Sequence, residues 1–98
     1  MPAYIIADID VTDPEGYEEY RARVPAVIAA HGGRYLVRGG AIERLEGGWP
    51  LKRCAVLEFE NMAAAKAFWE SPEYRPLREI RERTANSRIV AVESYVPV

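Results

Sequence analysis

Two glycine pairs constrain the fold of this chain more than any other feature. Gly32-Gly33 and Gly39-Gly40 flank the short segment 34–38, and His31 and Arg38 stand directly before them. Glycine readily adopts the positive φ at which helices end and strands bend. The first pair therefore predicts the end of a helix, and the second pair predicts a bend or bulge after a short strand.

The segment before the first pair predicts a strand followed by a helix. Residues 3–11 are rich in β-branched and aliphatic side chains and contain neither Gly nor Pro, which is typical of a strand. Asp13 and Pro14 suit the cap and the first turn of a helix. Apolar residues then recur at helical spacing as far as His31, where this helix is expected to end.

The rest of the chain predicts three further strands and two further helices. A turn at 47–50 is expected to pair the second strand with the third as a hairpin. The elements are a strand over 34–38 that continues extended over 41–46, a strand over 53–60, helices over 61–69 and 76–86, and a strand over 88–96.

This order of elements predicts an α+β protein with the ferredoxin-like fold. A βαββαβ arrangement with an extra short helix gives a four-stranded antiparallel sheet with helices on one face. The first, third and last strands carry apolar residues on both faces, so the face without helices needs a cover. We expect a second copy of the chain to supply it, which makes a homodimer and a dimeric α/β barrel.

Composition narrows the class of protein. The chain has 98 residues, which predicts one domain over 1–98. Its net charge of −2 comes from well-mixed acids and bases, which argues against nucleic-acid binding. No apolar run is long enough to span a membrane and no secretory signal precedes the first strand, so a cytoplasmic location is expected. One cysteine and one histidine cannot form a metal cluster, and we expect no metal or other cofactor.

Three residues are candidates for catalysis. His31 can act as a general acid or base near neutral pH, or it can simply cap the first helix. Arg38, re-aimed by the bend after it, can hold a carboxylate or enolate oxygen. Glu58 interrupts an apolar strand, and counting from the turn places it near Arg38. We therefore predict a contact between Arg38 and Glu58, either as a structural ion pair or with a role in proton transfer.

Five further residues are candidates for binding a substrate. Tyr17 and Tyr20 share the apolar face of the first helix, and their hydroxyls can reach a pocket. Trp69 and Tyr74 can form its walls, although such aromatic residues also serve simply as core. Arg81 lies at the inward edge of the last helix, where it either reaches a cavity or extends along the surface.

Three functions are consistent with these residues. The first is a small enzyme or binding protein for a small organic acid or aromatic compound, which works without a metal cofactor. The second is a non-catalytic dimer module in which the same residues only close the fold. The third is a tautomerase-like enzyme, which requires removal of Met1 so that the secondary amine of Pro2 can act as a base.

The combined motifs resemble those of one family. They are the segment His31–Gly40, Leu45-Glu46-Gly47, Leu57-Glu58-Phe59, the segment Trp69–Tyr74, and Arg81. Together they are similar to the domain of unknown function 1330 family over almost the whole chain. The resemblance implies a ferredoxin-like domain that forms a dimeric α/β barrel, with an uncharacterised function. Members usually end the last strand with Glu-Gly, whereas this chain has Glu93-Ser94.

Overall fold

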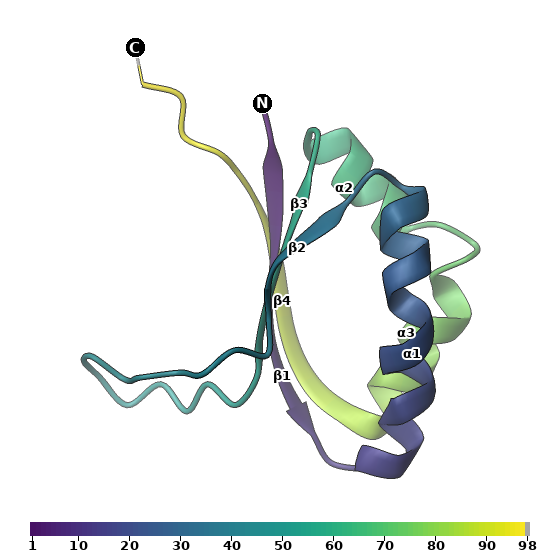
Figure 1. Cartoon of the computed structure of the whole chain (residues 1–98), viewed down its shortest axis with the longest axis vertical. Coiled ribbons are helices and arrows are strands. Elements are labelled where there is room, and N and C mark those ends of the chain that lie inside the picture. The colour runs from purple at the N-terminus through teal and green to yellow at the C-terminus, as the bar shows by residue number, and fades with distance from the viewer. Residues whose placement is uncertain (98) are drawn as a thin grey trace.

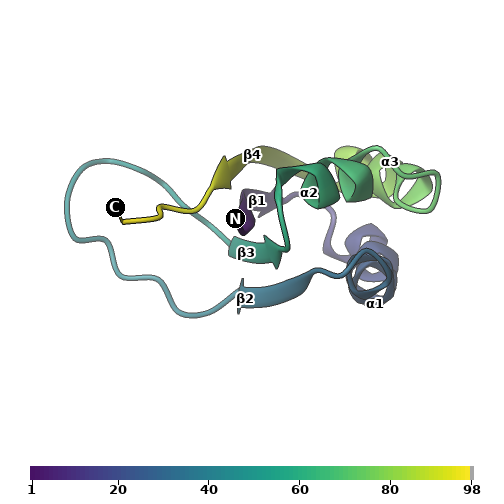
Figure 2. The same ribbon diagram turned by 90° about the horizontal axis from the view of Figure 1, so that it is seen from above.

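The computed structural model describes residues 1–97, and Val98, the last residue of the predicted domain, lies outside the described residues. Within residues 1–97, four strands form one antiparallel sheet in the order β2-β3-β1-β4, and three helices cover one of its faces (Figures 1 and 2). The elements are β1 (Ala3–Val11), α1 (Pro14–Ala30), β2 (Arg34–Arg38), β3 (Cys54–Phe59), α2 (Met62–Trp69), α3 (Arg75–Thr84) and β4 (Ala85–Glu93). The predicted ferredoxin-like α+β arrangement with an extra short helix is confirmed.

The strand β1 is one of the two inner strands of the sheet, because it pairs with both β3 and β4. Its odd-numbered residues from 3 to 9 are buried in the core that the helices cover, and the even-numbered residues between them lie on the other face. This alternation is the strand periodicity of two residues. The largest fully buried side chains of the core are Phe59, Phe68, Tyr74 and Leu77.

The helix α1 begins and ends where local signals predict. The Asp13 side chain accepts a hydrogen bond from a backbone N–H of the first turn at 3.2 Å. At the other end, Gly32 has a φ of +77°, and the Gly33 N–H donates to the Ile28 carbonyl at 2.9 Å. A left-handed glycine with such a bond closes the last turn of a helix.

Two predictions about strands are wrong. Residues 39–53 form no strand, but a long loop that projects from the sheet on the side away from the helices (Figure 1). Its apolar side chains are exposed because no neighbouring strand pairs with it. The last strand begins at Ala85 rather than at residue 88, because β1 extends to Val11, which pairs with Ala85 directly after α3. It ends at Glu93.

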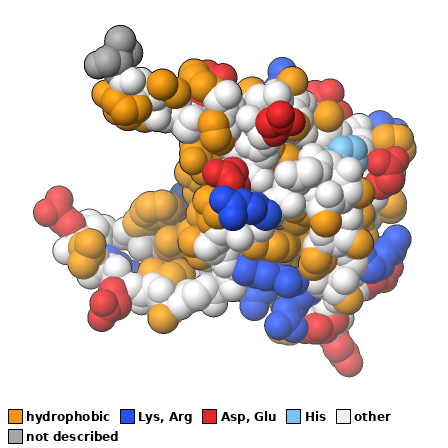
Figure 3. Space-filling model, turned by 45° about the horizontal axis from the view of Figure 1, so that its top comes forward, with side chains coloured by type: hydrophobic (Ala, Val, Ile, Leu, Met, Phe, Trp, Pro, Cys, Tyr) orange, Lys and Arg blue, Asp and Glu red, His pale blue; other side chains and the backbone are white. Residues whose placement is uncertain are grey.

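The sheet face opposite the helices is apolar and uncovered. Val90 is 60% exposed, and Val37 and Val92 are also exposed on this face. The projecting loop adds the exposed side chains of Leu45 and Trp49. Figure 3 shows hydrophobic side chains along this loop and in the angle between the loop and the sheet. Exposed apolar surface of this kind marks a place where another molecule packs.

Asp8 lies on this uncovered face and accepts two side-chain hydrogen bonds there. Its carboxylate accepts hydrogen bonds from Arg88 Nη2 at 2.8 Å and from Trp49 Nε1 at 3.2 Å. Trp49 therefore ties the projecting loop to β1. Burial raises the pKa of the Asp8 carboxyl, but the hydrogen bonds that it accepts and the positive charge of Arg88 together lower this pKa by more than burial raises it. The pKa of Asp8 therefore lies below its ordinary value.

Candidate functional site

A bulge inside β2 turns Arg38 toward the helices. The pairing of β2 with β3 shifts register at Leu36, which is an extra residue on its strand. Such a residue changes the face on which the following side chains lie. Arg38 consequently lies opposite Ala55, which itself pairs with the buried Ala7 on the helix-covered face. The bulge thus lies within the strand rather than at Gly39-Gly40, where the sequence predicted it.

The predicted contact between Arg38 and Glu58 is wrong. Glu58 lies opposite Arg34 on the uncovered face, where Arg34 Nη2 approaches Glu58 Oε1 to 2.7 Å. Arg38 Nη2 instead donates to the backbone carbonyl of Arg21 on α1 at 2.9 Å. A register counted from a tight turn does not apply here, because residues 39–53 leave the sheet.

Arg38 lines a cavity between α1 and the sheet, which we call the arginine–tyrosine cavity. Its volume is about 220 Å³. Three arginines and three tyrosines line it, and none of its lining residues is acidic. The cavity is therefore cationic, with aromatic walls. The lining residues are Ile9, Tyr17, Tyr20, Arg21, Val24, Tyr35, Arg38, Gly39, Arg53 and Ala55.

Two of these arginines are held against aromatic rings. The guanidinium carbon of Arg38 lies 4.8 Å from the centre of the Tyr35 ring, and that of Arg53 lies 5.7 Å from the centre of the Tyr17 ring. Neither arginine forms an ion pair with any residue that the structure describes, whereas Arg21 pairs with a glutamate at the exposed rim at 3.5 Å. Stacking orders the two guanidinium groups without neutralising them, so both remain available to an anion.

The tyrosines of the cavity keep their protons at neutral pH. Burial raises the pKa of the Tyr17, Tyr20 and Tyr35 hydroxyls above the ordinary value of 10.0. Arg53 lowers the pKa of Tyr17 in part, and Arg38 does the same for Tyr35, but neither reverses the direction. These phenols therefore act as hydrogen-bond donors rather than as bases.

Tyr74 and Arg81 lie behind the cavity and do not line it. Their side chains are buried, and Arg81 is only 4% exposed. The Tyr74 hydroxyl lies 3.0 Å from the Tyr20 hydroxyl, and Arg81 Nε donates to Tyr74 at 3.4 Å. The three residues form a polar cluster between α1 and α3, in contact with the cavity through Tyr20.

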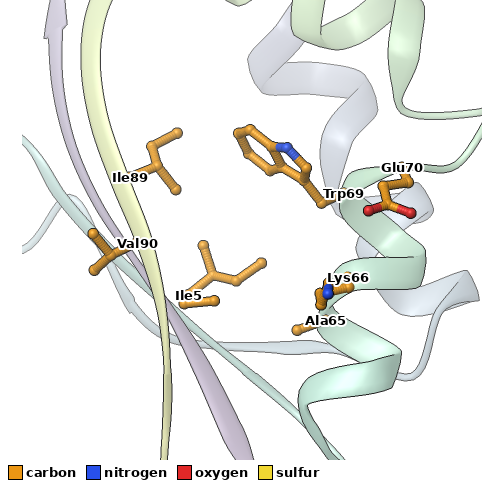
Figure 4. Close-up of a pocket in the computed structure, with 8 residues that line it drawn as sticks. Ile5, Ala65, Lys66, Trp69, Glu70, Ile89 and Val90 are labelled. Carbon is orange, nitrogen blue, oxygen red and sulfur yellow. The ribbon is translucent and has the colours of Figure 1, made fainter.

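Trp69 lines a second cavity of about 250 Å³ between α2 and β4. The Trp69 indole extends from α2 toward Ile89, and Ile5 points from the sheet toward the helix (Figure 4). The walls of this cavity are largely apolar. The predicted binding residues are thus divided, because Tyr17 and Tyr20 line one cavity and Trp69 lines the other.

His31 is the C-cap residue of α1 and lines neither cavity. Its Nε2 lies 3.2 Å from Glu73 Oε1, and its ring meets Phe68 edge-on at 6.0 Å between centres. The structure therefore does not bring together the three predicted catalytic residues, and of these only Arg38 lines one of these two cavities.

Arg53 and Tyr35 are cavity residues that sequence reasoning missed. The sequence indicates on which face Tyr35 lies, because side chains alternate along a strand and Tyr35 follows Arg34 directly in β2. Arg53 directly precedes β3, and nothing in the local sequence predicts which way its side chain points. Its approach to Tyr17 depends on the packing of α1 against the sheet.

Residues 1–97 contain neither a candidate metal site nor a membrane-spanning helix. No three His, Cys, Asp or Glu side chains in this range lie close enough together to hold a metal ion. None of the helices in the same range combines the length and the apolar composition that crossing a bilayer requires. Pro2 is exposed and lines neither cavity.

The fold and the cavity define a small ferredoxin-like α+β protein with a cationic, aromatic cavity beneath its helices. The chain belongs to the family described as domain of unknown function DUF1330, whose model matches residues 2–95. The family resemblance of the sequence motifs is thereby confirmed. No protein of curated function matches the sequence.

Solved structures share this fold. The RPA0582 protein of unknown function from Rhodopseudomonas palustris is 20% identical, with a TM-score of 0.77 over 98% of this chain and 84% of that chain. A dimeric ferredoxin-like protein of unknown function from Jannaschia sp. CCS1 is 13% identical, with a TM-score of 0.71 over 96% of this chain and 100% of that chain. SnoaB, a cofactor-independent oxygenase from Streptomyces nogalater, is 15% identical, with a TM-score of 0.67 over 99% of this chain and 96% of that chain. At these identities the likeness shows the fold alone.

Proposed function

We propose that this protein binds a small organic anion with an aromatic or apolar body in the arginine–tyrosine cavity. The lining of the cavity carries the proposal: three arginines and three tyrosines surround about 220 Å³ without an acidic side chain. Guanidinium donors match the two oxygens of a carboxylate in geometry and charge. A small carboxylic acid is therefore the ligand class that suits this lining best.

The lining residues take separate roles in this proposal. Arg38 and Arg53 neutralise the charge of the ligand. Both are stacked on tyrosine rings, and no described carboxylate pairs with either of them. Tyr17 and Tyr20 donate hydrogen bonds, and the ring of Tyr35 packs against the apolar body. Pockets for drug-sized ligands have volumes of roughly 300–1,000 Å³. The smaller cavity here favours a ligand of about one ring.

Chemical conversion of the bound acid is an extension of the same proposal. A fixed arginine next to the ligand stabilises negative charge as it develops on an enolate or carboxylate oxygen, and Arg38 has this position. The fold neighbour SnoaB is a cofactor-independent oxygenase, which supports chemistry on this fold without a cofactor. His31 and Glu58 lie outside the cavity and have no part in the proposed site.

Calorimetric titration with benzoate tests the binding proposal. We expect the wild-type protein to bind benzoate and to bind benzyl alcohol, which has a similar body without the charge, much more weakly. The Arg38→Met variant loses a charge-assisted contact and binds benzoate about tenfold more weakly or worse. Arg23→Met is the matched control, because it removes an exposed arginine of α1 that pairs with Glu19 outside the cavity.

The same titration separates binding from a purely structural role. Under the alternative, a non-catalytic dimer module, the wild-type protein binds neither benzoate nor short aliphatic acids. Arg38→Met then only lowers the melting temperature. That outcome would contradict the proposed function.

We infer in addition that a second copy of the chain covers the uncovered sheet face. The exposed apolar side chains of β2, β4 and the projecting loop support this inference. The fold neighbour from Jannaschia sp. CCS1 is a dimeric ferredoxin-like protein, which is consistent with it. A chain of this size gains stability by burying such a face in a symmetric dimer.

Analytical ultracentrifugation at micromolar concentration tests the dimer. The wild-type chain is expected to sediment as a dimer, and Val90→Lys, which places a charge in the middle of the uncovered face, is expected to sediment as a monomer. Ala63→Lys adds the same charge to the exposed side of α2 and serves as the control. A wild-type chain that stays monomeric would contradict the inference.

A further inference from the structure

The polar cluster behind the cavity forms a chain of two hydrogen bonds. A guanidinium group donates but never accepts, so the Tyr74 oxygen accepts from Arg81 Nε at 3.4 Å. The Tyr74 and Tyr20 hydroxyls lie 3.0 Å apart, and by distance alone either one can donate. Among the hydrogen bonds of residues 1–97, the Tyr74 hydrogen has no acceptor other than Tyr20. The Tyr20 hydrogen likewise has no acceptor among these bonds other than Tyr74, so pairing alone allows either direction. The positive charge of Arg81 favours donation from Tyr74 to Tyr20, because both hydroxyl hydrogens then point away from the guanidinium.

This direction leaves the hydrogen of Tyr20 free. Its oxygen accepts from Tyr74, and the part of the chain that the structure describes offers its hydrogen no other acceptor. Tyr20 lines the arginine–tyrosine cavity, while Tyr74 and Arg81 do not. A buried hydroxyl without an acceptor is unfavourable, so an acceptor atom of a ligand in the cavity would complete the chain of hydrogen bonds.

The protonation states agree with a chain of donors. Burial by itself lowers the pKa of Arg81, but the neighbouring Tyr74 and Tyr20 hydroxyls raise it more, so that the guanidinium stays charged. Burial raises the pKa of Tyr20, so that this hydroxyl keeps its hydrogen. No described carboxylate forms an ion pair with Arg81, and its charge therefore polarises the two hydroxyls toward the cavity.

We propose that Arg81 and Tyr74 hold the Tyr20 hydroxyl as a hydrogen-bond donor to an anionic oxygen of the ligand. The inference rests on the proposed function, because it places that ligand in the arginine–tyrosine cavity. It makes Tyr20 a specificity-determining residue, and Arg81 and Tyr74 positioning residues that act through it. Tyr20 then presents its hydrogen to the ligand together with the guanidinium groups of Arg38 and Arg53. This arrangement favours a carboxylate or an enolate over an uncharged alcohol or amide.

Benzoate titration of four variants tests this arrangement. Tyr20→Phe removes the donor and is expected to weaken benzoate binding roughly 10- to 100-fold, as for a hydrogen bond to a charged group. Arg81→Met frees the Tyr74 oxygen to accept from Tyr20, so the chain reverses and benzoate binding falls about tenfold. Arg81→Lys keeps a donating cation and retains most of the affinity. Adding Tyr74→Phe to Arg81→Met removes the competing acceptor, which restores most of the binding.

The rescue by Tyr74→Phe distinguishes positioning from mere support of the fold. If Arg81 only stabilises the core, the double variant binds benzoate more weakly than Arg81→Met, and the inference is overturned. It is also overturned if Tyr20→Phe binds benzoate like the wild type while Arg38→Met does not, a result that leaves the proposed function intact. Circular dichroism monitors the folding of each variant. If Arg81→Met does not fold, the benzoate affinity of Tyr20→Phe alone decides whether the inference holds. A wild-type protein that binds no acid overturns both proposals.

Discussion

Replacing Gly33 by alanine tests whether space, rather than backbone conformation, requires glycine at the end of α1. Gly33 does not have a positive φ. An added Cβ would lie 2.5 Å from Phe59 Cε1 and 2.9 Å from Ile28 Cγ2. Both neighbours are buried, and the Phe59 ring is stacked on Phe68 at 5.4 Å between centres. Neither side chain can move away without disturbing the core.

The expected loss of stability follows from this crowding. Overpacking a core costs about 1–3 kcal/mol, and two buried neighbours place Gly33→Ala at about 2–3 kcal/mol. In a domain of this size, a loss of 1 kcal/mol lowers the melting temperature by roughly 4–8 °C. Gly33→Ala is therefore expected to melt about 10 °C or more below the wild type. Urea unfolding followed by circular dichroism measures the free energy directly.

Two other glycines supply the controls. Gly32 has a φ of +77° but open space around it, so Gly32→Ala pays only for the left-handed backbone, about 1 kcal/mol. Gly40 does not have a positive φ, and a Cβ added to it would have no atom within 4 Å. Gly40→Ala is therefore expected to change the free energy of unfolding by less than about 0.5 kcal/mol. A Gly33→Ala protein as stable as Gly32→Ala would refute the packing argument.

Two further predictions concern carboxylates on the uncovered face. The pKa of Asp8 lies below its ordinary value of 3.8, so its ionised form adds stability above that pH and loses it as the pH falls through the folded-state pKa. Asp8→Asn is expected to lower the free energy of unfolding by only about 1 kcal/mol at neutral pH, because the partner Arg88 is largely exposed. Urea unfolding in neutral and in acidic buffer checks that this difference from the wild type disappears in acid. Glu58→Gln is expected to change the free energy of unfolding by less than about 1 kcal/mol, because Arg34 is 70% exposed. It is also expected to leave benzoate affinity unchanged, and a clear loss in the titration would contradict the placement of Glu58.

Local signals predicted most of the elements. The apolar runs, the Asp13 cap and the glycine after α1 place the first strand and helix as the structure has them. These features depend on interactions within a few residues, and short-range sequence therefore contains them. The loop over 39–53 was not predictable in this way. The sequence predicts an extended chain over 41–46, and only the lack of a pairing partner keeps this segment out of the sheet.

The candidate site was less predictable than the fold. The sequence predicts Arg38, Tyr17 and Tyr20 as site residues, and all three line one cavity, but Arg53 and Tyr35 complete it from other elements. The sequence also predicts Trp69, Tyr74 and Arg81 as binding residues. The first lines another cavity, and the other two lie behind Tyr20. Which of these side chains meet depends on helix packing across the sheet, which no local pattern specifies.

The sequence by itself determined that the chain is an α+β protein and where α1 starts and stops, and it predicted a bend at Gly39-Gly40, after Arg38. Only the tertiary structure decided on which face Arg38 lies. Side chains alternate along a strand, so one extra residue exchanges the two faces for every position after it. The bulge at Leu36 arises from pairing with β3, a strand that is distant in the sequence. That pairing places Arg34 in an ion pair with Glu58 on the uncovered face, and it places Arg38 in the lining of the cavity.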